Sequence, residues 1–169
     1  MRINLKYPFL FVLMILLQVL IFNNIQVSGY INPQVYIFFI LVLPVNIKGS
    51  VLLLLAFGMG LILDTFADSL AIHALSSLFM ALFRPAILRI FSDNLDPEDM
   101  ASPSYYNIGT ISLFLYSLIL VLIHHSTLFF LELFRFDELF QTLSRALISS
   151  GLTILFIMVA FAFTGRSGD

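Results

Sequence analysis

The sequence predicts an all-α protein that crosses a membrane six times and forms a single integral membrane domain over residues 1–169. Two observations support this fold class. Hydrophobic residues make up 60% of the chain and charged residues only 11%, whereas an average soluble domain has roughly 45–50% and about 25%. In addition, six apolar stretches approach the roughly 20 residues that a helix needs to cross a hydrocarbon core about 30 Å thick.

Prolines and short connections divide the apolar sequence into six predicted spans. They run from about Pro8 to Ile25, Pro33 to Asn46, Gly49 to Ala67, Leu70 to Phe91, Pro103 to Phe130 and Glu138 to Phe163. The second is the shortest, with Pro33 in its first turn and Pro44 ending or kinking it. Pro85 is expected to bend or break the fourth near its end. Ser102 and Pro103 are suited to the N-cap and first position of the fifth.

The distribution of basic residues predicts the orientation, because cytoplasmic loops carry an excess of Lys and Arg. With the N-terminus inside, the cytoplasmic side receives Arg2, Lys6, Lys48, Arg84, Arg89 and Arg166. Arg135 falls outside and Arg145 near the outer boundary. The first span is expected to be retained, since no A-x-A-like cleavage site follows it. We therefore expect both termini in the cytoplasm.

Several function classes lack support in the sequence. Cysteine is absent, so disulfides and thiolate sites are excluded. The scattered Lys and Arg residues form no basic stripe for nucleic acid. Adjacent His124 and His125 point about 100° apart on a helix and lack the spacing of a zinc-binding helix. We find no catalytic constellation, and expect neither an enzyme nor a bound metal or cofactor.

The connection 92–104 is strongly acidic. It contains Asp93, Asp96, Glu98 and Asp99 and is too short to form a domain. It is either a solvated cytoplasmic loop or a contact patch for a cytoplasmic partner.

Ionisable residues within the spans are candidates for a polar cluster, because such groups usually face protein or water rather than lipid. Asp64 lies about 24 Å along the third span from Lys48, at about 1.5 Å per residue. His73, His124 and Arg145 should reach the same outer level from other spans, and Asp68 lies one turn beyond Asp64. The candidate cluster is therefore Asp64, Asp68, His73, His124 and Arg145. Within it we expect Asp64 to pair with Arg145, whose charge cannot be shed. The alternatives are separate groups in the wet interface, or a proton relay through Asp64 and His73.

Small residues on the third span predict close helix packing. Ala56, Gly58 and Gly60 follow one another at every second position, and Ala56 and Gly60 have the spacing of a small-xxx-small face.

The same region resembles a family motif. The run from Gly60 to Asp64, followed by the run from Ser69 to Leu75, is similar to the central motif of the rod shape-determining protein MreD family. The matching residues are Gly60, Asp64, Leu70, Ala74 and Leu75. Ala56 and Ala71 stand where that family commonly has Gly, and Asp68 where it has a small residue or Gly. Asn32-Pro33, before the second span, also looks like the family's pattern.

The resemblance implies a non-enzymatic scaffold of the bacterial cell-wall elongation machinery, in the cytoplasmic (inner) membrane, that supports rod shape and peptidoglycan synthesis. Its partners would be the bitopic protein MreC, the peptidoglycan synthases and, indirectly, MreB filaments, with a homodimer left open. The family fold resembles the six-helix substrate-binding subunit of energy-coupling-factor transporters.

That likeness leaves a vitamin-type uptake subunit as the alternative. Such a subunit would need a small-residue face on its first helix, where the residues from Phe9 to Leu17 are bulky throughout. A membrane enzyme acting on lipid or prenyl groups is a third class, and only the polar cluster suggests it.

Overall fold

The computed structural model describes residues 5–24, 32–91, 102–133 and 139–164. Within these ranges all regular structure is helical, which confirms the predicted all-α class. The elements are α1 (Lys6–Leu20), the 3₁₀ turns η1 (Phe22–Asn24) and η2 (Val35–Ile37), α2 (Phe38–Val42), α3 (Gly49–Ala67), α4 (Ile72–Phe91), α5 (Tyr105–Ile108), α6 (Thr110–Leu133) and α7 (Leu139–Thr164).

Five helical stretches in the described part of the chain are long and apolar enough to cross a membrane. They are Lys6–Asn24, Gly49–Ala67, Ile72–Phe91, Thr110–Glu132 and Thr142–Phe163. The predicted second span, 33–46, does not form a helix of this length. Its helical part covers only η2 and α2, and it ends at Leu43, whose φ of −56° and ψ of 151° are the extended values that a residue before proline prefers. Pro44 therefore ends this helix, as its position predicted.

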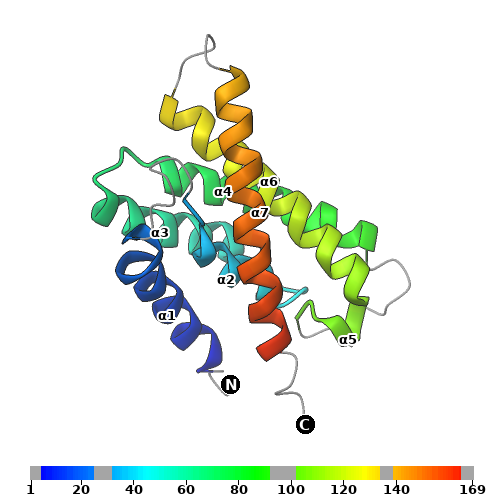
Figure 1. Ribbon diagram of the computed structural model, residues 1–169. Coiled ribbons are helices and arrows are strands. Elements are labelled where there is room, and N and C mark those ends of the chain that lie inside the picture. The colour runs from blue at the N-terminus through cyan, green and yellow to red at the C-terminus, as the bar shows by residue number, and fades with distance from the viewer. Residues whose placement is uncertain (1–4, 25–31, 92–101, 134–138, 165–169) are drawn as a thin grey trace.

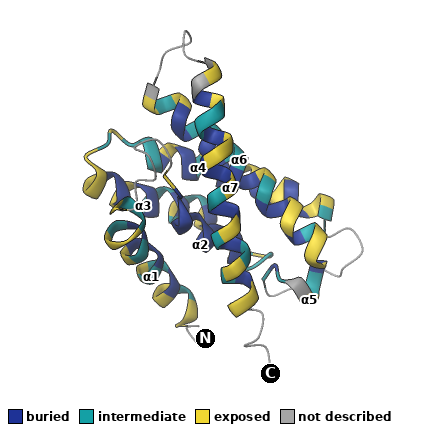
Figure 2. Ribbon diagram, viewed as in Figure 1, coloured by how far each residue is buried: buried dark blue, intermediate teal, exposed yellow. Residues whose placement is uncertain are grey.

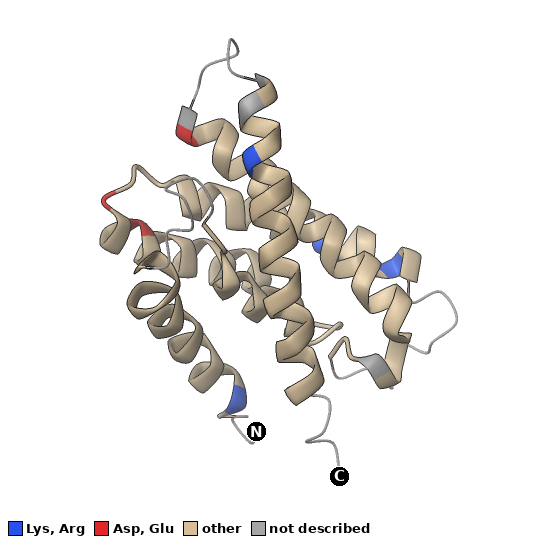
Figure 3. Ribbon diagram, in the orientation of Figure 1, with Lys and Arg blue, Asp and Glu red and all other residues tan. Residues whose placement is uncertain are grey.

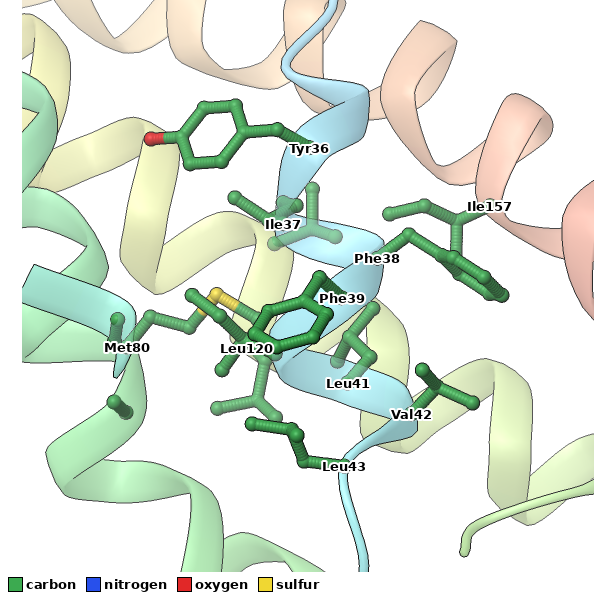
Figure 4. Close-up of a cluster of buried hydrophobic side chains, with 14 of the residues drawn as sticks. Tyr36, Ile37, Phe38, Phe39, Leu41, Val42, Leu43, Met80, Leu120 and Ile157 are labelled. Atoms are coloured by element: carbon green, nitrogen blue, oxygen red, sulfur yellow. The ribbon is translucent and has the colours of Figure 1, made fainter. Parts of the chain in front are cut away.

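The residues from Pro33 to Leu43 form a central segment inside a ring of the longer helices. Each of them is buried, and α2 is dark blue throughout in Figure 2. Figure 4 shows its side chains meeting Met80 of α4, Leu120 of α6 and Ile157 of α7. Extended and 3₁₀ residues advance about 3.3 Å and 2.0 Å each, against 1.5 Å in an α-helix. A partly extended segment can thus cross the interior with few residues.

The longer helices pack in chain order, α3 on α4, α4 on α6 and α6 on α7, while α1 lies against α3 and the central segment. The start of α1 and the end of α7 lie toward the same lower end in Figure 1. Outward-facing side chains are large and apolar, for example Phe9, Leu54 and Leu147, with exposed fractions of 68%, 71% and 61%. Charged residues are sparse over the described helices (Figure 3).

Some predicted boundaries need correction. The helix α4 continues through Pro85 to Phe91 without a break. The predicted fifth span is divided at Gly109, whose φ of +80° separates α5 from α6. The acidic residues of the connection 92–104, Asp93, Asp96, Glu98 and Asp99, lie outside the described residues, as do Arg2, Arg135 and Arg166.

Candidate functional site

The carboxylate of Asp64, in the last turn of α3, caps the start of α4. Its Oδ1 accepts hydrogen bonds from the Ser69 hydroxyl at 2.5 Å and the His73 backbone N–H at 3.0 Å, and its Oδ2 accepts from the Ala74 N–H at 2.9 Å. The Nδ1 atom of His73 lies 2.9 Å from the same Oδ1. The first N–H groups of a helix have no partner within it. Asp64 supplies that partner from the preceding helix and ties the two together.

We predict that Asp64→Ala lowers the free energy of unfolding by about 2–3 kcal/mol, because it leaves the N–H groups at the start of α4 without their cap. Unfolding of the purified protein by SDS titration in mixed micelles would measure the loss. Asp68→Asn is the matched control, since Asp68 is exposed and Asn tolerates its left-handed backbone. Equal stability of Asp64→Ala and Asp68→Asn would contradict the capping role.

Gly60 allows α3 and α4 to approach closely. A Cβ atom at this position would overlap the backbone of Ala74 and would lie 2.6 Å from the carbonyl carbon of His73. Ala56, one turn earlier, is fully buried. Gly58 differs, because a Cβ there would meet nothing within 4 Å. The predicted close packing is therefore confirmed at Gly60, while Gly58 is no part of it.

The turn between α3 and α4 uses two left-handed residues. Asp68 has a φ of 51° and donates its N–H to the Asp64 carbonyl, ending α3, and Ala71 has a φ of 59°. Leu70, between them, is 93% exposed, and Leu75 is 38% exposed. The matching motif residues therefore divide into buried Gly60, Asp64 and Ala74, which hold the turn, and two leucines that face outward.

We predict that Ala71→Gly raises the free energy of unfolding by about 1 kcal/mol, because glycine adopts the left-handed backbone without the steric cost that alanine bears. The same SDS titration would measure the gain. Ala86→Gly, on an exposed helical position of α4, should instead lower it by roughly 1 kcal/mol. A loss of stability in Ala71→Gly would show that the turn does not hold this conformation.

At the start of the central segment, Gln18 of α1 binds backbone groups that have no partner within a helix. This side chain is 2% exposed. Its Oε1 accepts from the N–H groups of Val35 at 2.9 Å and Tyr36 at 3.3 Å. Its Nε2 donates to the Pro33 carbonyl at 3.1 Å and to Asn23 Oδ1 at 2.9 Å. The Gln18 amide therefore accepts from two backbone N–H groups of the central segment and donates to one of its carbonyls.

Tyr36 extends these contacts across the interior. Its hydroxyl lies 2.7 Å from His124 Nε2 and 3.0 Å from the Ser77 hydroxyl, and the side chain points away from the central segment in Figure 4. The rings of Tyr36 and His73 have centroids 6.2 Å apart. The tyrosine thus connects α4 and α6 at the level of the Asp64 cap.

A second bridge joins the central segment to α6 and α7. The Gln34 N–H donates to Thr153 Oγ1 at 3.0 Å, and that hydroxyl lies 3.1 Å from His125 Nε2. The Nδ1 atom of His125 lies 3.0 Å from the Val121 carbonyl. A carbonyl can only accept, so Nδ1 carries the proton in this bond. The residues that make these contacts at the start of the central segment are together called the polar layer. They are Gln18, Gln34, Tyr36, Ser77, His124, His125 and Thr153.

At the other end of the central segment, Arg84 of α4 binds carbonyls at the end of α2 and just after it. Its side chain is 1% exposed. The guanidinium donates to the carbonyls of Leu41, Leu43 and Pro44 and, through Nε at 3.0 Å, to the Tyr116 hydroxyl. Tyr116 in turn donates to the Leu41 carbonyl at 3.1 Å. These contacts of Arg84 and Tyr116 are called the arginine clamp.

The predicted polar cluster is formed in part. Asp64 and His73 are in contact, and Tyr36 links their neighbourhood to His124. Asp68 is exposed in the turn. The predicted pairing of Asp64 with Arg145 is not observed: the carboxylate of Asp64 forms an ion pair with His73, whose backbone N–H also binds it.

Sequence reasoning missed the residues that hold the central segment. Gln18 is a single polar residue in an apolar stretch, which was a usable signal. Arg84 was considered only as a charge on the cytoplasmic side, and its burial against α2 was not foreseen. Tyr116 and Thr153 carry no such signal, because their roles depend on which backbone groups the fold brings to them.

The fold and its interior define the class of the protein: it is a multi-pass α-helical membrane protein with a buried irregular segment. Comparison of the chain with protein-family models, with curated proteins and with solved structures finds no match. Within a bilayer, backbone that leaves the helix is tolerated only where protein or a water-filled cavity satisfies it. The polar layer and the arginine clamp supply that satisfaction at the two ends of the central segment.

Proposed function

We propose that this protein is a non-enzymatic membrane scaffold of the bacterial cell-wall elongation machinery, acting with an MreC-type bitopic partner in the cytoplasmic membrane. The observation that carries the proposal is the position of the motif residues that resemble the MreD family. Gly60 permits the close approach of α3 and α4, and Asp64 caps α4. A motif that fixes helix geometry suits a protein that acts by holding others in place.

The interior contacts support the same proposal. Gln18, Asp64 and Arg84 are buried polar or charged groups within the helices, a kind of group that often marks a transport or proton pathway in a membrane protein. In this structure all three bind backbone groups of the protein itself. Their role is to fix the positions of the helices, and the broad apolar surfaces of the helices remain for lipid and for partner helices.

We further propose that both termini are cytoplasmic. The start of α1 and the end of α7 lie at one end of the bundle (Figure 1). Lys6 begins α1, Lys48 precedes α3 and Arg89 lies in the last turn of α4. Because α3 and α4 are antiparallel neighbours joined by the turn at 68–71, Lys48 and Arg89 lie at the same end, as the positive-inside rule requires.

Co-purification from native membranes tests the proposed function. An affinity-tagged chain would be extracted in mild detergent and its partners identified by mass spectrometry. Recovery of a bitopic elongation protein together with peptidoglycan synthases would support the scaffold. Recovery of an ATPase module with a bound vitamin would overturn it in favour of the uptake subunit.

Depletion of the protein in its native cells provides the second test. We expect rod-shaped cells to become round, and expect rescue by the wild type and by Gly58→Ala but only weakly by Gly60→Ala at equal membrane level. Cells that keep their shape after depletion would contradict a role in elongation.

A further inference from the structure

The seam between α6, α7 and the start of the central segment contains buried polar atoms that lack partners. Among the described residues, these are Gln34 Oε1, Ser117 Oγ, His124 Nδ1, Ser149 Oγ and Ser150 Oγ. Their side chains are at most 4% exposed. An unsatisfied buried polar atom costs roughly 1–3 kcal/mol, so native proteins contain few of them. Five such atoms among the described residues are more than a fully satisfied interior would contain.

Four of the five atoms belong to residues beside one hydrogen-bonded bridge. Gln34, Thr153 and His125 form that bridge. His124 is the neighbour of His125, and their rings lie 5.4 Å apart. Ser149 and Ser150 precede Thr153 by four and three positions, and residues at these spacings are neighbours on a helix. Ser117 lies two turns away from His124 along α6 and is not part of this site.

The chemistry of these atoms selects the ligand. Gln34 Oε1 can only accept, whereas the serine hydroxyls both donate and accept, and His124 Nδ1 does one or the other according to its tautomer. An anion would face the Gln34 carbonyl oxygen, and a cation would have only neutral groups to coordinate it here. A small neutral molecule that both donates and accepts satisfies every partner.

We propose that this seam binds water and that His124, although buried at membrane depth, is hydrated. The site consists of Gln34, His124, Ser149 and Ser150 beside the Thr153–His125 bridge. Asn32, two residues before Gln34, is exposed, so the chain reaches the surface close to this site. The proposal does not depend on the scaffold function and would hold for an uptake subunit as well.

Water-edited solid-state NMR of the full-length protein in lipid bilayers tests the proposal, with water itself as the probe. We expect magnetisation to pass from water to the His124 ring several-fold faster than to Leu120. Leu120 is the internal control because it is fully buried on α6, one turn from His124. Transfer to His124 as slow as to Leu120 would overturn the proposal.

The double variant Ser149→Ala/Ser150→Ala tests whether the two serines hold the water. We expect transfer to His124 to fall several-fold, while the resonances of the His125–Thr153 bridge keep their wild-type positions. Those resonances report that the fold is intact. Unchanged transfer in a folded variant would overturn the assignment of this site to the serines.

Discussion

Arg84→Met should destabilise the protein by about 3 kcal/mol or more, the largest loss that we expect from removing one side chain. The substitution removes the donor of the buried Leu43 carbonyl and of the buried Tyr116 hydroxyl, and each such group costs roughly 1–3 kcal/mol. The partly buried Pro44 carbonyl keeps its bond from the Ile47 N–H. The Leu41 carbonyl keeps its bond from Tyr116. Because the free energy of unfolding of a protein is about 5–15 kcal/mol, this loss would be a large part of its total stability. SDS titration of the purified variant would measure it.

Arg89→Met is the matched control for the arginine clamp. Arg89 carries the same charge on the same helix but is exposed in its last turn. We expect its stability to stay close to that of the wild type. Arg84→Lys should recover part of the loss, because an ammonium group can still donate to carbonyls but lacks the planar fork of the guanidinium. If Arg84→Met and Arg89→Met were equally stable, the clamp would not hold the central segment.

The arginine clamp also shows where sequence reasoning succeeds and fails. The five long helices are predictable, because each is an apolar run of 19 to 23 residues, close to the roughly 20 that the hydrocarbon core requires. The central segment was predicted as the second of six spans because it is apolar and bounded by prolines. Its helix begins only at Val35 and ends at Val42. The sequence does not show that Gln18 binds the free backbone groups at its start and Arg84 those at its end, because these contacts depend on the fold.

The α3–α4 turn was predicted more completely. Gly60 was identified from the spacing of small residues and Asp64 as an ionisable residue within a span, and the structure gives both a physical role. The pairing of Asp64 with Arg145 failed because helix rise gives the depth of a residue but not the direction in which its side chain points. Asp64 faces the first turn of α4, whose N–H groups lie closer to it along the chain than any partner on α7.

Gly60→Ala should destabilise the protein and Gly58→Ala should not, although both add one methyl group to α3. At Gly60 the new Cβ would overlap the backbone of Ala74, so α3 and α4 must move apart, and we expect a loss of about 2–3 kcal/mol. At Gly58 the new Cβ meets nothing within 4 Å. There the better helix propensity of alanine should leave stability unchanged or raise it by up to about 1 kcal/mol.

A second substitution sharpens this comparison. The overlap at Gly60 is with backbone atoms of Ala74 and His73 rather than with a side chain. Adding Ala74→Gly to Gly60→Ala should therefore fail to restore stability, because the Cα atom in the way remains. SDS titration of the two single variants and the double variant would measure all three effects. If Ala74→Gly rescued Gly60→Ala, the contact between the helices would be made by side chains, and the backbone approach at Gly60 would not be what joins α3 to α4.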